Sequence, residues 1–232
     1  MNRFLKVVTA FLLMAIVTVG CKPDEPIPTD DPVVMEGCVD LGLPSGILWA
    51  TCNIGASVPE EAGTYFAWGD TVSKEMYDWK SYRYANFVEG NYLLNKYCIN
   101  PVCGVGGFVD SLTTLEPVDD AATANLGTEW RMPTREEFDE LYRETTFVWT
   151  TLNGVEGRLL TGRNGNSIFL PATGFYLDDK LICTGLGIYW SSSLQTTSQV
   201  SAWSLHFDYE NCHVCATYER SRGQCVRAVR AL

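Results

Sequence analysis

The residues in this sequence best suited to chemistry are the cysteines and histidines near its C-terminal end. Cys212 and Cys215 are separated by two residues, one of which is His213. Thiolate and imidazole groups at this spacing can bind zinc, and Cys225 or Cys183 could complete a tetrahedral set. The chain has only two histidines, however, and the features described below indicate export, where paired cysteines usually form disulfides. We therefore expect no metal site and no cofactor.

Disulfides are the alternative use of these cysteines. The segment Cys38–Cys52 has the pattern of a hairpin whose turn is centred on Ser45, which would place the two terminal thiols opposite each other. Cys98 and Cys103 flank an Asn-Pro turn signal and could form a local bridge. Spacing alone does not choose among the pairings of the cysteines that follow Cys21. The disulfide candidates are Cys38, Cys52, Cys98, Cys103, Cys212 and Cys215.

The other polar residues do not form a catalytic set. The sequence has no Ser/His/Asp order, no phosphate-binding loop and no carboxylate pair at a meaningful spacing. Asp178 and Asp179 could offer oxygen ligands to calcium, but two acids in one loop are usually solvated. His206 alternates with apolar neighbours on a predicted strand and is expected at the surface. We expect a protein without catalytic activity.

The first 21 residues have the pattern of a lipoprotein signal peptide. Arg3 and Lys6 precede an apolar run over residues 7–19, which is too short to span about 30 Å of hydrocarbon. The run ends in Gly20-Cys21, a sequence that resembles a bacterial lipobox, in which the cysteine is lipidated. We predict lipidation at Cys21; the alternative is an ordinary secreted protein.

Residues 22–35 have the composition of a linker, with four prolines and four acids. Such a segment favours extended polyproline II and would span roughly 40 Å. Its beginning is similar to the acidic signal that directs some Bacteroidota lipoproteins to the cell surface; the alternative is a linker whose charges only keep it soluble. The predicted location is the bacterial outer membrane, lipid-anchored and surface-exposed.

The net charge disfavours two classes of partner. Removing residues 1–21 takes away two basic residues and no acid, so the net charge falls by two, from −11 to −13. Nucleic acids and anionic membrane surfaces are bound through clusters of Lys and Arg, which this chain lacks. We expect no nucleic-acid partner, and contact with the membrane only through the lipid anchor.

Two helices can be predicted from their capping residues. Thr134 and Glu137 form a capping box at the start of a helix over residues 134–144. Phe138, Leu141 and Tyr142 recur at helical spacing and give it one apolar stripe. A short second helix over residues 121–126 follows two acids and ends at a glycine.

The rest of the pattern consists of short strands. Two Asn-Gly pairs, at 153–154 and 164–165, lie between apolar runs and predict hairpins. Residues 65–70 are expected to form a strand, and residues 71–110 long loops pinned by tyrosines. Four further strands are expected near the C-terminus, over residues 187–192, 202–209, 214–218 and 225–229.

Several motifs together resemble one known family. They are VDLGLPSG (39–46), WATCNIGA (49–56), YFAWGD (65–70), LEPVDDAAT (115–123), WRMPTREEFDEL (130–141), TGRNGNSIFLPATGF (161–175), YWSSS (189–193) and GQCVRAV (223–229). The resemblance is to the Fibrobacter succinogenes major paralogous domain of Bacteroidota surface lipoproteins, and it covers residues 36–232. It implies an α+β, C-type-lectin-like fold with short antiparallel sheets, two helices and long loops. It implies no settled activity.

Three functions are compatible with this resemblance. The first, which we favour, is a binding module that holds an extracellular protein or glycan with its C-terminal loops. Trp190 and Trp203 are expected in the core, so the segment 209–220 is the better surface. A second is a thiol oxidase of the related formylglycine-generating type, although the spacing of the cysteines differs; a third is a subunit of a surface filament. The predicted ligand-binding residues are Tyr209, Asn211, His213 and Tyr218.

Overall fold

The computed structural model describes residues 34–35 and 37–232, which belong to one compact unit, Pro32–Leu232. The predicted signal peptide, lipidated Cys21 and nearly all of the predicted linker lie outside the described residues. Among the residues that the structure describes, none of the helices has the length and apolar character needed to cross a membrane.

The described unit is a mixed helix-and-strand fold built mostly from short antiparallel sheets. Its α-helices are α1 (Ala121–Leu126) and α2 (Arg135–Glu144). Short 3₁₀ segments are Pro101–Cys103, Val105–Gly107 and Pro117–Asp119. The predicted coarse class, α+β with two helices and short antiparallel sheets, is therefore confirmed.

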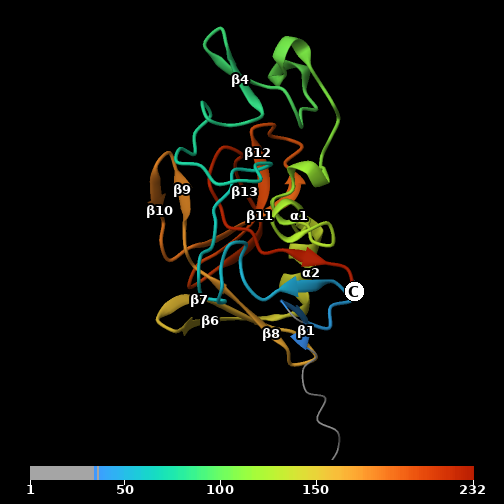
Figure 1. Cartoon of the computed structure of the whole chain (residues 1–232), viewed down its shortest axis with the longest axis vertical. Coiled ribbons are helices and arrows are strands. Elements are labelled where there is room, and N and C mark those ends of the chain that lie inside the picture. Colours follow the sequence, from blue (N-terminus) through green and yellow to red (C-terminus); the bar gives the residue numbers. More distant parts are fainter. Residues whose placement is uncertain (1–33, 36) are drawn as a thin grey trace, which may run out of the picture. The chain divides into compact units, whose positions relative to one another are not determined.

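The strands form three larger sheets and two ribbons, all antiparallel (Figure 1). The first sheet contains, in order, β1 (Val34–Met35), β2 (Cys38–Asp40), β3 (Leu48–Ala50) and β14 (Val229–Arg230). The second contains β6 (Thr146–Leu152), β7 (Val155–Thr161) and β8 (Ser167–Pro171). The third contains β11 (Gly187–Leu194), β12 (Ser201–Phe207) and β13 (Cys212–Glu219). The ribbons are β4 (Ala85–Val88) with β5 (Asn91–Leu94), and β9 (Phe175–Leu177) with β10 (Lys180–Ile182).

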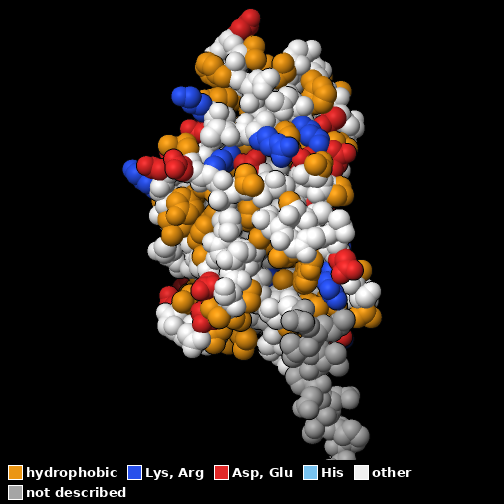
Figure 2. All heavy atoms as spheres, viewed as in Figure 1, with side chains coloured by type: hydrophobic (Ala, Val, Ile, Leu, Met, Phe, Trp, Pro, Cys, Tyr) orange, Lys and Arg blue, Asp and Glu red, His pale blue; other side chains and the backbone are white. Residues whose placement is uncertain are grey.

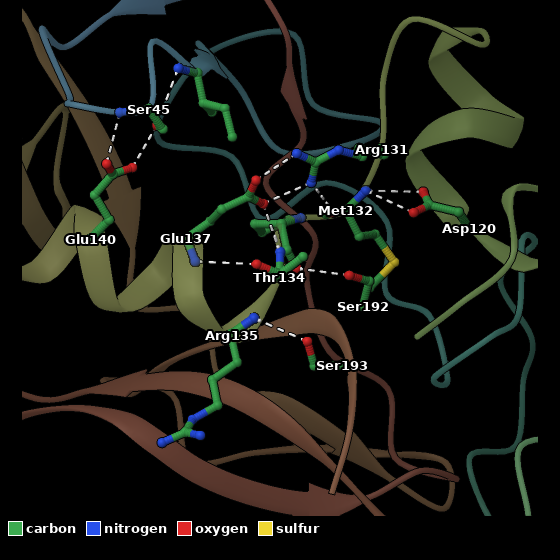
Figure 3. Close-up of polar contacts among 12 residues, drawn as sticks. Ser45, Asp120, Arg131, Met132, Thr134, Arg135, Glu137, Glu140, Ser192 and Ser193 are labelled. Carbon is green, nitrogen blue, oxygen red and sulfur yellow. Dashed lines mark hydrogen bonds and ion pairs between the residues drawn. The ribbon is translucent and has the colours of Figure 1, made fainter. Parts of the chain in front are cut away.

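Helix α2 begins as its sequence predicts. The Thr134 hydroxyl accepts a hydrogen bond from the Glu137 N–H (3.2 Å), and the Glu137 carboxylate accepts one from the Thr134 N–H (2.8 Å; Figure 3). Phe138 and Leu141 are buried, as predicted, but Tyr142 is 43% exposed. The apolar stripe is thus narrower than predicted, because Tyr142 lies at its edge.

Helix α1 is also confirmed, and its cap has a second role. The Asp120 carboxylate accepts hydrogen bonds from the N–H groups of Ala122 (2.8 Å) and Thr123 (3.0 Å) at the start of the helix. It also accepts one from the Met132 N–H at 2.8 Å, just before α2 (Figure 3). Asp120 therefore joins the beginnings of both helices.

Both Asn-Gly pairs occur in hairpins. Asn153 and Gly154 have positive φ angles of 48° and 88° between the paired residues Leu152 and Val155, which is the geometry of a type I′ turn. The second pair lies in the longer connection between β7 and β8.

Four predictions about strands were wrong. Residues 71–110, predicted to be long loops, contain the β4–β5 ribbon. Residues 65–70 form no strand; Phe66 makes only an isolated bridge with Gln224. The last strand is limited to Val229–Arg230. In the N-terminal hairpin Cys38 pairs with Ala50, so Cys52 lies beyond the paired residues and does not face Cys38. The reason is that the turn is closed by a hydrogen bond from the Gly46 N–H to the Leu43 oxygen. The pairing of the two strands is therefore not centred on residue 45.

The core surrounds the β11–β13 sheet. Trp190 on β11 is completely buried, as predicted, and its indole N–H donates to the Phe66 oxygen (2.9 Å). Trp203 on β12 is only half-buried, which corrects the prediction, because it points to the sheet face opposite that of the buried Ala202 and Ser204. The Arg135 guanidinium of α2 covers its ring at 4.3 Å. At the end of the unit that carries β4 and β5, hydrophobic side chains gather at the surface (Figure 2), among them Phe87 and Tyr92.

Candidate functional site

The predicted ligand-binding residues lie on strand β13 and on the turn before it. Tyr209 and Asn211 belong to the turn between β12 and β13, and Tyr209 is 71% exposed. His213 is exposed near the beginning of β13. Tyr218 is near the other end of the strand and is half-buried, with its ring 5.5 Å from that of Phe175. The structure therefore brings Tyr209, Asn211 and His213 to one end of β13, whereas Tyr218 lies near the other end, with His206 between its ring and that of His213.

The turn that carries Tyr209 is held by a buried arginine that sequence reasoning missed. Arg158 of β7 is 8% exposed, and its Nη2 donates to the backbone oxygens of Asp208 (2.7 Å), Tyr209 (3.1 Å) and Asn211 (3.3 Å). No local signal in the sequence identifies this role, because residues 158 and 209 are joined only by the packing of two sheets.

The Asp208 side chain completes the turn. Its Oδ1 accepts hydrogen bonds from the N–H groups of Glu210 (2.7 Å) and Asn211 (2.6 Å). Backbone hydrogen bonds of this kind stabilise the charged carboxylate, so they lower the pKa of Asp208. Tyr209 is thereby presented on a fixed backbone, with its ring edge-on to Trp149 at 6.0 Å.

The two cysteines of the Cys-x-x-Cys motif lie on an extended strand rather than in a loop. Three residue steps along a strand separate Cα atoms by about 10 Å, beyond the distance of about 7 Å that a disulfide allows. Cys212 is half-buried, and burial raises the pKa of its thiol to about 12. Cys215 is exposed, with its sulfur 3.6 Å from Nη2 of Arg135.

The cysteines of the described residues are all free thiols, so none of the predicted pairs is bonded in this structure. Cys98 is buried, and its thiol donates to the Asn100 oxygen (3.2 Å) instead of bonding to Cys103. Within residues 34–35 and 37–232, no group of three or more His, Cys, Asp or Glu side chains has an arrangement that could hold a metal ion.

A histidine pair lies across strands β12 and β13. His206 and His213 are paired directly, with ring centroids 6.0 Å apart. Nδ1 of His206 lies 3.1 Å from the Tyr218 hydroxyl, and its Nε2 is buried with no partner in the described part of the chain. His206 is therefore half-buried rather than at the surface as predicted, and burial, with His213 nearby, lowers its pKa.

A further hollow that the sequence did not reveal is an open pocket of about 490 Å³ between the segment 63–77 and strand β9. Three of its lining residues are Tyr65, Tyr77 and Tyr176. They come from segments a hundred residues apart in the sequence, so no motif could have indicated that they meet.

The Cys225 thiol lies beside Tyr65, one of the residues that line this pocket. Cys225 is completely buried, and its sulfur lies 3.4 Å from Oγ1 of Thr173. Burial raises the pKa of this thiol to about 11, so it is protonated at neutral pH.

Comparison of the chain with protein-family models, with curated proteins and with solved structures finds no match.

Proposed function

We propose that this protein is a non-catalytic, lipid-anchored binding module on the surface of a bacterial outer membrane. In this proposal the turn and edge strand that carry Tyr209, Asn211, His213 and Tyr218 hold an extracellular protein or glycan. The proposal retains the C-type-lectin-like fold and the resemblance to the Fibrobacter succinogenes major paralogous domain. The two helices and the short antiparallel sheets are compatible with that fold.

The observation that carries the proposal is the way Tyr209 is held. An exposed aromatic ring on a backbone fixed by Arg158 loses little conformational entropy when a ligand binds, so more of the contact energy remains as affinity. Asn211 and His213 are also exposed and add polar groups at the same end of β13, a combination typical of adaptable binding surfaces.

The state of the cysteines argues against the thiol-oxidase alternative. Reactive cysteines are accessible and have a lowered pKa, because the thiolate is the nucleophile. Burial instead raises the pKa of Cys212 to about 12 and that of Cys225 to about 11. Neither of these two thiols is ionised at neutral pH, so neither is prepared for attack. Cys215 is exposed beside Arg135, but on the extended strand it lies about 10 Å from Cys212, so the two do not form a working pair.

Binding of the purified protein to a glycan array and to a panel of extracellular proteins tests the proposal. We expect at least one ligand whose binding is weakened roughly tenfold by Tyr209→Ala, the loss of about 1.4 kcal/mol. Tyr92→Ala is the matched control, because Tyr92 is also exposed (40%) but belongs to the β4–β5 ribbon. Unchanged binding in Tyr209→Ala and His213→Ala for every ligand would exclude this surface. If the protein oxidises a peptide thiol with oxygen, and Cys212→Ser abolishes this activity, the result would favour the thiol-oxidase alternative.

A further inference from the structure

We propose that the pocket formed by Tyr65, Tyr77 and Tyr176 is a second binding site and that it takes a neutral saccharide. Its volume of about 490 Å³ falls within the range of small-molecule sites.

Two of the tyrosines form a fixed floor. Tyr65 and Tyr77 are 9% and 3% exposed. The Tyr65 hydroxyl donates to the Thr173 oxygen (2.8 Å), and the Tyr77 hydroxyl donates to the Tyr65 oxygen (2.6 Å). Gly223 allows Tyr77 to lie there, because a Cβ atom at position 223 would come within 2.7 Å of the ring.

The two sides of the pocket are joined by backbone hydrogen bonds. The Tyr77 N–H donates to the Asp178 oxygen (2.8 Å), and the Asp178 N–H donates to the Tyr77 oxygen (3.2 Å). Tyr176 packs on the floor with its ring centroid 4.9 Å from that of Tyr65 and 5.4 Å from that of Tyr77. The pocket therefore exists before any ligand binds.

The groups at the mouth remain free for a ligand. Tyr176 is half-buried, and its hydroxyl has no hydrogen-bond partner among the described residues. Within the same part of the chain, the exposed side chains of Ser73 and Glu75 also have none. Together they offer one accessible ring, two hydroxyl groups and one carboxylate.

The charge of the pocket selects against ions. Nζ of Lys74 is held by the Asp70 carboxylate (2.7 Å) and the Ser81 oxygen (3.2 Å), so its charge is already paired. The unpaired carboxylate of Glu75 repels anions. Nζ of Lys74 already lies over the Tyr77 ring, 5.8 Å from its centre, so that ring is not free to bind a cationic ligand by a cation–π contact.

A neutral saccharide matches the free ring, hydroxyl groups and carboxylate at the mouth of the pocket. The C–H face of a sugar ring can pack on the Tyr176 ring, while sugar hydroxyls donate to the Glu75 carboxylate and bond to the hydroxyls of Ser73 and Tyr176. This site is distinct from the β13 surface. Successive residues of a strand point to opposite faces, and on β9 Phe175 contacts Tyr218 whereas Tyr176 lines the pocket. The inference therefore stands independently of the function proposed above.

Ligand-observed saturation-transfer NMR on the purified full-length chain tests this site, with glucose, galactose, mannose and N-acetylglucosamine as probes. We expect at least one sugar to bind. Tyr176→Ala should weaken it roughly tenfold, and Tyr176→Phe by less, because the phenylalanine keeps the ring. Glu75→Gln, at an exposed position, should weaken the same sugar without affecting folding.

Tyr209→Ala is the matched control and should leave sugar binding unchanged, since it removes an exposed ring from the β13 surface. Near-ultraviolet circular dichroism confirms that each variant is folded. Absence of binding by all four sugars would overturn the inference. Equal affinity of a sugar for the natural sequence, Tyr176→Ala and Glu75→Gln would also overturn it. Loss of sugar binding only in Tyr209→Ala would overturn it as well.

Discussion

Three arginines, Arg158, Arg220 and Arg227, are buried without a carboxylate partner among the described residues. In Arg227, backbone oxygens take the place of a carboxylate. The guanidinium donates to the oxygens of Ala50 (3.1 Å), Thr51 (3.0 Å) and Phe169 (3.0 Å). Its Nε also donates to Oδ1 of Asn53 (3.0 Å), so four oxygens accept from its planar fork of donors, while burial lowers the pKa of Arg227. Arg158 and Arg227 thereby hold together backbone segments that have no strand pairing with each other. Arg220 differs, because only its Nη1 donates, to the Tyr97 oxygen (3.1 Å), and its Nε and Nη2 have no partner in the described part of the chain.

The titration of His206 makes the stability of the fold depend on pH. Burial, and then His213, lowers its pKa below the value of about 6.5 expected in the unfolded chain. As the pH falls, the unfolded chain therefore takes up this proton first. The contribution of His206 to stability is complete above about pH 6.5 and decreases as the pH falls toward the folded-state pKa.

Urea unfolding at pH 7.5 and 5.5 measures this effect. We expect the free energy of unfolding to fall more between these pH values in the natural sequence than in His206→Gln, whose side chain does not titrate. An equal fall in both proteins would contradict the lowered pKa.

At the scale of elements, helix α2 depends on its buried stripe. Phe138 is 1% exposed and lies 5.7 Å from the Trp49 ring. We expect Phe138→Ala to lower the free energy of unfolding by about 3–5 kcal/mol, because it removes a buried ring and leaves a cavity. Tyr142→Ala, on the same helix but 43% exposed, is the control and should cost less than about 1 kcal/mol. A loss below about 1 kcal/mol for Phe138→Ala in chemical denaturation would contradict this packing.

Elements whose signals are local could be predicted from the sequence. The capping box at Thr134, the cap at Asp120 and the turn at Asn153-Gly154 each depend on residues only a few positions apart. These contacts form within the element itself, so the pattern and the structure agree.

The candidate sites could be predicted only in part. Cys-x-x-Cys has the same spacing in a turn and in a strand, and the pairing of β13 with β12 makes it a strand. The exposure of Tyr209 followed from its polar neighbours, but its support by Arg158 depends on contacts between two sheets. The tyrosine pocket likewise depends on the link from Tyr77 to Asp178, which no periodicity reveals.

At the scale of the whole molecule, the predicted location concerns residues outside those described. We expect metabolic labelling with a radioactive fatty acid to mark the natural chain and not the Cys21→Ala variant, because the thiol of Cys21 is the predicted attachment point. Immunoblotting of both proteins controls for expression. Equal labelling of the two would contradict the predicted lipid anchor.

The closure of the first sheet bears on the order in which the chain can fold. Strand β14 pairs with β3, and the hydrogen bond from Arg227 to the Ala50 oxygen joins residues 177 positions apart. While the chain is being synthesised, β3 has no partner on this edge, and the carbonyl oxygens that Arg227 will bind have no partner within the chain. Contacts of such long range form late and slowly. The nascent chain therefore completes its core only after Val229 has emerged, and a product truncated before that residue keeps an open sheet edge that proteases and chaperones can recognise.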